Sequence, residues 1–219
     1  MMTCKSSEDR TVKLAICRAG TGLFDDAGRR FDAWQWRWVA APEAAGELEK
    51  VAPRDALRQM LAGQKVRAVP VGVIGPKEAS AAQLETAQAL GREIALLGLA
   101  VLTGGKSGVM EAASRGAFEA GGLTLGLLPD EDWHAANPYV TVPLATGIGP
   151  ARNALIARAA MALIAVGGEH GTLSEMALGL HFGKCVFALC GAPPVAGAVV
   201  CQDIDDVLER LAATLLHLD

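Results

Sequence analysis

The chain has 219 residues, of which 51% are hydrophobic and 20% are charged, and its formal net charge is −4. This length suffices for one large domain, or for one domain with a small extension, and the hydrophobic content supports a folded core. The acidic balance excludes a non-specific nucleic-acid binder, which needs a basic face. No stretch reaches the roughly 18 apolar residues of a membrane span, and the scattered cysteines are typical of reduced thiols. We therefore expect a cytoplasmic protein without nucleic-acid or membrane partners.

Residues 1–65 differ in residue pattern from the rest of the chain. The run "AWQWRWVAA" alternates, with Trp34, Trp36 and Trp38 on one side, and this period predicts a strand. Its expected hairpin partner is "TVKLAIC", across "DDAGR", and residues 43–62 are expected to be helical. The tryptophan face has two interpretations that the sequence leaves open. It packs on the main domain or on a second subunit, or its rings cover a base in a ligand pocket.

From residue 66 to the C-terminus, short apolar runs alternate with helical segments. Ser80 with Gln83 predicts a capping box at the first of these helices. Strands that are apolar throughout and alternate with helices indicate a parallel sheet covered on both faces. The predicted fold is therefore α/β, a Rossmann-like doubly wound sheet over residues 66–219, with residues 1–65 as a small extension of a β-hairpin and a helix. The expected strands are 66–75, 99–105, 123–129, 161–168, 186–190 and 197–201, and the expected helices are 80–98, 108–122, 149–160, 172–184 and 204–218.

Three glycine-rich turns follow strands of this predicted sheet: "GVIGPKEAS", "TGGKSGVME" and "VGGEHGTLSE". In such folds ligands bind outside the carboxyl ends of the strands. Glycine lets backbone N–H groups approach an anion closely, and a helix N-terminus adds unpaired donors. The chain has no Walker motif and no complete G-x-G-x-x-G, so it is the grouping of three turns that predicts a phosphate-binding cleft. The residues expected to contact the anion in the first two turns are Gly75, Lys77, Gly104, Gly105, Lys106, Ser107 and Gly108.

Thr172 and Glu175 form T-x-x-E at a predicted helix start, which is the capping-box pattern. One interpretation is therefore structural: Thr172 caps the helix, Glu175 returns the bond, and no chemistry occurs. The other is a site that holds a phosphate and acts on it. Residue types alone leave both interpretations open.

Several motifs in fixed order over residues 70–190 resemble a known superfamily. "GGEHGTLSE" resembles the PGGxGTxxE signature of the LOG family, the cytokinin-activating nucleotide phosphoribohydrolases often labelled lysine decarboxylases. "GVIGPKEAS", "LTGGKSGVMEAASRGAFEAGG", "GLLP", "ATGIGPARN" and "GTLSEMALGL" are more similar to the molybdenum-cofactor carrier proteins and their uncharacterised bacterial relatives. Residues 1–65 lie outside the resemblance.

The resemblance implies a nucleotide-type ligand with its phosphate at Gly168, Gly171 and Thr172. It also implies that Arg152 and Glu175 match the family's catalytic arginine and glutamate, a pair that the carrier-like relatives keep. A carboxylate can stabilise an oxocarbenium-like ribose or activate water, and an arginine can orient anionic groups. The chain departs from the hydrolase pattern at four positions: Gly167 replaces Pro, Glu169 replaces the second Gly, Ser174 replaces the first Glu, and Asn153 replaces Lys.

Among the histidines, His170 is a candidate acid, base or phosphate donor, and His134 in "DWHAANPY" is expected in a loop beside the cleft. His181 and His217 are expected to be structural. No His, Cys and Asp cluster has metal-ligand spacing, so no metal site is expected.

The function predicted from the sequence is a binding or carrier protein for a phosphorylated nucleotide or pterin ligand, similar to the molybdenum-cofactor carriers. No cofactor is required, although a bound nucleotide or molybdenum cofactor fits this role, and a homo-oligomer, dimer or tetramer, is expected. Two alternatives are a LOG-like phosphoribohydrolase that releases a base from a nucleoside 5′-monophosphate, and a nucleotide sensor. Lysine decarboxylase activity is not expected.

Overall fold

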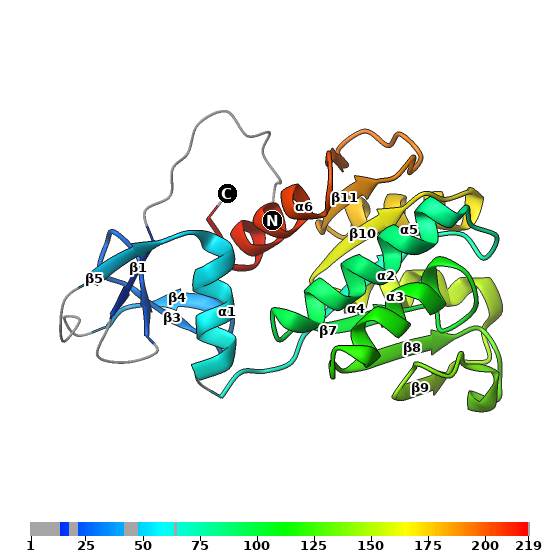
Figure 1. Ribbon diagram of the computed structural model, residues 1–219, viewed down its shortest axis with the longest axis horizontal. Helices are drawn as coiled ribbons and strands as arrows, with labels where there is room; N and C mark the ends of the chain where they lie inside the picture. The colour runs from blue at the N-terminus through cyan, green and yellow to red at the C-terminus, as the bar shows by residue number, and fades with distance from the viewer. Residues whose placement is uncertain (1–13, 18–21, 42–47, 64, 219) are drawn as a thin grey trace. The chain divides into compact units, whose positions relative to one another are not determined.

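The computed structural model describes residues 14–17, 22–41, 48–63 and 65–218 (Figure 1). The chain folds into two compact units. The larger unit covers Val69–Val207, and the smaller unit combines the described residues from Leu14 to Ala68 with Leu208 and the described residues that follow it. The sequence placed a domain boundary between residues 65 and 66 and did not predict that residues from Leu208 onward would group with the N-terminal region. All three glycine-rich turns belong to the larger unit.

The larger unit is built on a seven-stranded sheet whose described strand pairs are all parallel. The strand order is β12-β11-β10-β6-β7-β8-β9. The strands are β6 (Pro70–Ile74), β7 (Ala100–Thr103), β8 (Thr124–Leu128), β9 (Val142–Ala145), β10 (Ala162–Val166), β11 (Cys185–Leu189) and β12 (Val199–Val200). The sequence predicted six of these strands but not β9, which lies at one edge of the sheet.

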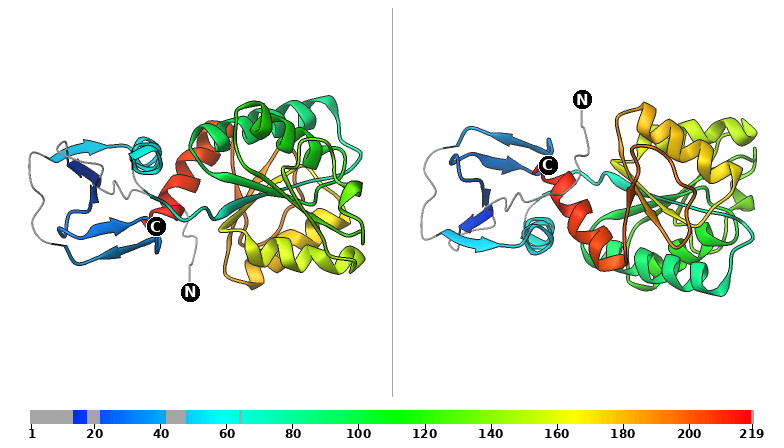
Figure 2. Two further views of the ribbon diagram at one scale, coloured as in Figure 1. Left: turned by 90° about the horizontal axis from the view of Figure 1, so that it is seen from below. Right: turned by 90° about the horizontal axis from the view of Figure 1, so that it is seen from above.

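Helices cover both faces of this sheet, which confirms the predicted Rossmann-like fold. Figure 2 shows α2 (Ala81–Leu96) and α3 (Val109–Glu119) on one face, and α4 (Asn153–Ala159) and α5 (His170–His181) on the other. The predicted capping box of α2 is also confirmed: the Gln83 N–H donates to Ser80 Oγ at 3.3 Å, and the Ser80 N–H donates to Gln83 Oε1 at 3.0 Å. No helix within the described residues is both long enough and apolar enough to cross a membrane.

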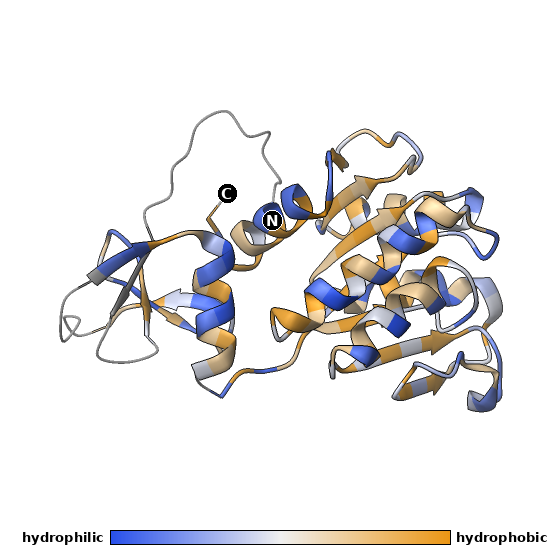
Figure 3. Ribbon diagram, in the orientation of Figure 1, coloured by the Kyte–Doolittle hydropathy of each residue, from blue (hydrophilic) through white to orange (hydrophobic). Residues whose placement is uncertain are grey.

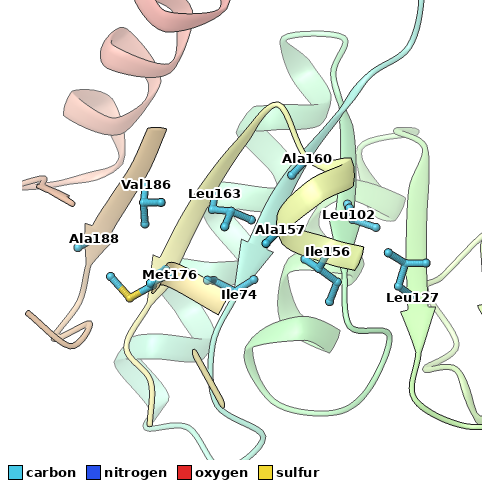
Figure 4. Packing of buried hydrophobic residues seen from close by; sticks show 11 residues of the cluster. Ile74, Leu102, Leu127, Ile156, Ala157, Ala160, Leu163, Met176, Val186 and Ala188 are labelled. Atoms are coloured by element: carbon cyan, nitrogen blue, oxygen red, sulfur yellow. The ribbon is translucent and has the colours of Figure 1, made fainter. Parts of the chain in front are cut away.

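The core of the larger unit forms where the central strands meet the helices. The central strands are apolar along their length (Figure 3), so both faces of the sheet can be buried. In Figure 4, Ile74, Leu163 and Val186 project from three neighbouring strands, and Met176 meets them from α5. These four side chains are at most 1% exposed. Close packing of this kind holds the carboxyl ends of β6, β10 and β11 in fixed positions.

The order in which successive strands are placed in the sheet reverses at β6. From β6 it adds β7, β8 and β9 on one side, and it then returns to add β10, β11 and β12 on the other. β6 and β10 are therefore neighbours, with Leu163 paired to Gly72 and Ala165 paired to Ile74. In doubly wound folds, the crevice outside the strand ends at such a switch point is where ligands bind.

The smaller unit contains an antiparallel sheet in the order β4-β3-β2-β1-β5. Its elements are β1 (Leu14–Cys17), β2 (Leu23–Phe24), β3 (Arg30–Asp32), β4 (Arg37–Val39), β5 (Leu48–Val51) and helix α1 (Pro53–Gly63). The last helix, α6 (Ile204–Leu215), begins in the larger unit and continues into the smaller one.

The predicted details of this region were partly wrong. Residues 33–36 form a turn, and only Arg37–Val39 of the tryptophan run is a strand. The turn forms because Asp32 Oδ1 accepts hydrogen bonds from the Trp34 and Gln35 N–H groups, and Trp36 adopts a positive φ of 52°. The "DDAGR" turn joins β2 to β3, and residues 48–51 form a strand where a helix was expected. Part of the expected helix lies outside the described residues.

The three tryptophans consequently have different surroundings. The buried Trp36 and the half-buried Trp38 meet Phe31 edge to face, at ring-centroid distances of 6.2 and 5.1 Å. Their indole N–H groups donate to the carbonyls of Arg67 and Leu216 at 2.9 and 2.8 Å. Trp34, by contrast, is exposed. Trp36 and Trp38 therefore pack inside the smaller unit, with their polar atoms satisfied.

Candidate functional site

The glycine-rich turns come together at the switch point. The turn after β6 and the turn after β7 are joined by a hydrogen bond from the Val109 N–H to the Pro76 carbonyl, 3.1 Å long. A Cβ on Gly75 would lie 2.7 Å from both Val109 Cβ and the Val166 carbonyl at the end of β10. Gly108 has a φ of +72° and packs against the backbone of the first turn. Only glycine fits these close approaches, so the turns form one continuous edge.

Arg152 and Glu175 meet beside this edge. Arg152 Nη1 donates to Glu175 Oε1 at 3.2 Å, and each side chain retains only 8% of its accessible surface. Gly104 makes room for the pair, because a Cβ there would lie 2.7 Å from the Arg152 Cζ. The second glycine turn, the 3-10 helix Gly149–Arg152 and α5 thus converge on one buried guanidinium.

Burial controls the ionisation of this pair. It raises the pKa of Glu175 to about 7, although the charge of Arg152 partly opposes the rise. Burial likewise lowers the pKa of Arg152, against the opposing charges of Glu175 and Asp130. Arg152 Nε is buried and has no hydrogen-bond partner among the described residues. One donor of the buried guanidinium is therefore left unsatisfied by the described residues.

The capping-box interpretation of Thr172 and Glu175 is wrong. Helix α5 begins at His170, two residues earlier than predicted, and its N-cap is Glu169, which makes no side-chain cap. Glu175 therefore lies in the second turn of the helix, on its buried side, and bonds to Arg152 instead of to the helix start. The error arose because the T-x-x-E pattern specifies spacing but not where the helix begins.

The third glycine turn gives α5 an open N-terminus. Gly167 and Gly168 have φ values of +62° and +138°, and Gly168 packs on the buried Thr172. His170 and Gly171 are exposed, and a Cβ on Gly171 would meet nothing within 4 Å. The first N–H groups of a helix have no partner within the helix, so this uncapped end presents donors to solvent. Glu169 is exposed in the same turn.

Two of the four departures from the hydrolase pattern bond to each other. Asn153 Nδ2 donates to Ser174 Oγ at 3.0 Å, and Ser174 Oγ donates to the Gly171 carbonyl at 2.7 Å. This chain of neutral bonds ties α4 to the first turn of α5. Asn153 and Ser174, which are neutral, occupy the positions at which the resembling hydrolases carry Lys and Glu.

Lys106 has a different environment from the one expected. Its ammonium donates to Asp130 Oδ2 at 2.9 Å and to the Ala135 carbonyl at 3.0 Å. The hydrogen bond from Lys106 lowers the pKa of Asp130, and the charge of Lys77 adds to this effect. Asp130 also acts electrostatically on Arg152. Asp130 is thus the ion-pair partner of Lys106, and its charge also acts on Arg152. It was missed because only its place after β8 hinted at the site.

The remaining candidates lie outside this cluster or at its border. His134 bonds through Nδ1 to Asp132 Oδ1 at 2.7 Å in the loop after β8. His217 Nε2 is 2.7 Å from the Trp36 carbonyl in the smaller unit, and His181 lies at the far end of α5. Within the described part of the chain, no group of three or more His, Cys, Asp or Glu side chains is arranged to hold a metal ion.

The SLOG cluster4 family model matches residues 68–211. An uncharacterised protein of Archaeoglobus fulgidus is 39% identical over 130 residues, which cover 59% of this chain and 84% of that protein. A solved molybdenum cofactor binding protein from the phototrophic bacterium Rippkaea orientalis has a TM-score of 0.64 at 34% identity, over 68% of this chain and 98% of that one. The solved molybdenum cofactor carrier protein of Chlamydomonas reinhardtii has a TM-score of 0.63 at 36% identity, over 68% and 99%. The predicted superfamily is therefore confirmed.

Proposed function

We propose, from the premise that this chain belongs to the SLOG cluster4 family, that it binds and carries a phosphorylated ligand of the nucleotide or pterin type. The observation that carries the proposal is the position of the glycine-rich turns at the switch point, with the buried Arg152 packed against the second of them at Gly104. Such an edge offers backbone donors and a buried cation to one anionic group. The solved relatives that bind or carry molybdenum cofactor match this chain over almost their whole length.

The residues present suit a phosphate group. Gly171 leaves open space at the start of α5, Gly104 lets the Arg152 guanidinium pack against the second turn, and Arg152 Nε has no partner among the described residues. Lys77 adds a second positive charge at the same edge. Anion binding here requires the exposed Glu169 to point away from the ligand. Lys106 either stays bonded to Asp130 when the anion binds or leaves Asp130 to bond to the anion. A cytoplasmic location and a homo-oligomeric state are part of the same proposal.

The direct experiment is mass spectrometry of small molecules released when the purified full-length protein is denatured. We expect a phosphorylated pterin or nucleotide. In parallel, AMP, GMP and inorganic phosphate should raise the melting temperature of ligand-free protein. If no phosphorylated molecule co-purifies and none of these probes shifts the melting temperature, the proposal is wrong.

A second candidate, a nucleoside 5′-monophosphate phosphoribohydrolase, is favoured by one observation. The pKa of Glu175 lies near 7, which suits a group that exchanges a proton at neutral pH. We rank it second because Asn153 and Ser174 form a neutral bond where the hydrolase pattern has charges. Chromatography of base released from a panel of nucleoside monophosphates separates the two functions. Release that disappears in Glu175→Gln establishes the hydrolase, and absence of release in the wild type supports the carrier.

A further inference from the structure

Trp133 is an exposed aromatic residue in the loop after β8. This loop lies beside the edge formed by the glycine-rich turns, which we call the anion-binding edge, and the proposed phosphate site does not use Trp133. Its side chain is 55% exposed, although an indole of this size is normally buried. The His134 ring stacks against it, with centroids 3.7 Å apart and planes inclined by 26°. This stack covers one face of the indole, and the exposure shows that much of the remaining surface is open. The indole therefore offers open aromatic surface on which a planar ring can stack.

The loop that carries Trp133 is fixed internally. Asp132 Oδ1 accepts from the His134 N–H at 2.9 Å and bonds to the His134 ring at 2.7 Å. The Ala135 and Ala136 N–H groups donate to the Asp132 and Trp133 carbonyls, which closes a turn of 3-10 helix. These hydrogen bonds order the loop that carries the indole, so little conformational entropy is lost when a ligand ring stacks on it.

The same loop is tied to the second glycine turn by three hydrogen bonds. Lys106 Nζ donates to the Ala135 carbonyl at 3.0 Å, the Asn137 N–H donates to the Gly105 carbonyl at 2.9 Å, and Asn137 Nδ2 donates to the Lys106 carbonyl at 3.0 Å. Trp133 lies two residues from Ala135, a span of at most about 7 Å of backbone. The indole is consequently held within a short reach of the second glycine turn, one of the three turns that form the proposed phosphate site.

The loop is also tied to the segment that leads to Arg152. The Gly147 N–H donates to the Asp130 carbonyl at 3.0 Å, and the Gly149 N–H donates to the Pro129 carbonyl at 3.0 Å. Gly149 begins the 3-10 helix that ends at Arg152. The loop after β8 therefore connects both the Lys106 side and the Arg152 side of the anion-binding edge, and the stacked pair projects from it.

We propose that Trp133, backed by His134, is the platform on which the planar heteroaromatic ring of the phosphorylated ligand stacks. The proposal rests on the proposed function, because it assigns the ring of the ligand whose phosphate lies at the glycine turns. Stacking on an aromatic side chain tolerates different rings, since each has a π-face, so purines and pterins both fit. Hydrogen bonds to the ring edge, and with them the choice between purine and pterin, then come from other groups.

The test compares ring-containing and ring-free probes on the full-length protein. Isothermal titration with AMP and GMP should show binding at least about fivefold weaker in Trp133→Ala and near wild type in Trp133→Phe. Ribose 5-phosphate, which has the phosphate but no ring, should bind both variants like the wild type. AMP should also quench the tryptophan emission of the wild type, and this quenching should be lost in Trp133→Phe. Trp34→Ala, which removes an exposed tryptophan of the smaller unit, is the matched control and should change neither result.

Each other outcome has a definite meaning. If AMP and GMP bind Trp133→Ala as they bind the wild type, the platform is wrong while the phosphate site stands. The same holds if the only effect of Trp133→Ala is a change in subunit number by light scattering, because the indole is then a subunit contact. If no probe, ribose 5-phosphate included, binds the wild type, the platform is wrong, and if no phosphorylated molecule co-purifies either, the proposed function is wrong as well.

Discussion

Arg152 donates a single hydrogen bond of 3.2 Å to Glu175, and both side chains are almost completely removed from solvent. Removing two charges from water costs more than one such bond returns, unless further partners complete the pair. Here the pKa of Glu175 rises to about 7, and Arg152 Nε has no partner among the described residues. The burial of this pair is therefore costly to the fold, which supports the role in ligand binding that we propose for it.

The first prediction concerns the dependence of stability on pH. Glu175 binds its proton more tightly in the folded state, since its pKa rises from 4.5 to about 7. Between these values the folded state holds more protons than the unfolded state, so stability should fall as pH rises from about 5 to 7. The contribution of this one group is on the order of 1–3 kcal/mol. Glu175→Gln, which stays neutral, should flatten this part of the profile.

Urea unfolding at intervals between pH 5 and 8 measures this effect. Other groups that titrate in the same range are shared by the wild type and the variant, so the difference between the two curves isolates Glu175. Parallel curves, with no difference that changes with pH, would show that the carboxyl titrates normally in the folded protein.

The second prediction concerns the open N-terminus of α5. A Cβ at Gly171 would meet no neighbour within 4 Å, so Gly171→Val should fold with a melting temperature within a few degrees of the wild type. The added methyl groups should stand where the anion approaches the helix N–H donors, and the thermal shift given by AMP or phosphate should disappear. A full shift in Gly171→Val would place the phosphate elsewhere.

Gly121→Val is a useful contrast for this variant, since Gly121 also has open space around its Cβ position but lies just after α3, outside the site. Its positive φ of 78° means that the substitution should lower stability, because a branched side chain is strained in that conformation. The ligand-induced thermal shift should nevertheless persist in Gly121→Val.

The third prediction concerns Asp130, the carboxylate that Lys106 holds at 2.9 Å. If Asp130 competes with the ligand anion for this cation, Asp130→Asn should increase the affinity for phosphate about threefold or more, because a negative charge is removed from the edge. The gain should shrink as salt concentration rises. Titration calorimetry with AMP at two ionic strengths measures both effects. Weaker binding in Asp130→Asn would instead identify the carboxylate as a support that orients Lys106.

The fourth prediction concerns assembly. Leu155 on α4 and Leu173 on α5 are 42% and 39% exposed on two helices that pack against each other. We expect this face to form a subunit contact, so Leu173→Glu should lower the mass measured by light scattering at micromolar concentration. Leu96→Glu changes a similarly exposed leucine on α2, which covers the opposite face of the sheet, and should leave the mass unchanged (Figure 2). A monomeric wild type would contradict the prediction outright.

The sequence by itself determined the fold class, since uniformly apolar runs such as β10 and β11, alternating with helices, are typical of central strands in a covered parallel sheet. It also located the three glycine turns, because residues that must follow a strand and open a helix leave a local signal. The start of α2 was predictable for the same reason: Ser80 and Gln83 bond within one turn.

Only the tertiary structure decided what depends on contacts between distant segments. Spacing alone could not distinguish a capping Glu175 from one bonded to Arg152, 23 residues away in the chain. The ion pair of Asp130 with Lys106, and the support of the Trp133 loop by Lys106, likewise require loops that meet only when parallel strands align their carboxyl ends. The fine structure around Trp36 was mispredicted because an Asp32-capped turn overrode the alternating pattern. Hydrogen bonds between residues close in the chain can be predicted from a sequence, but the partners of a buried charge depend on how distant segments pack together.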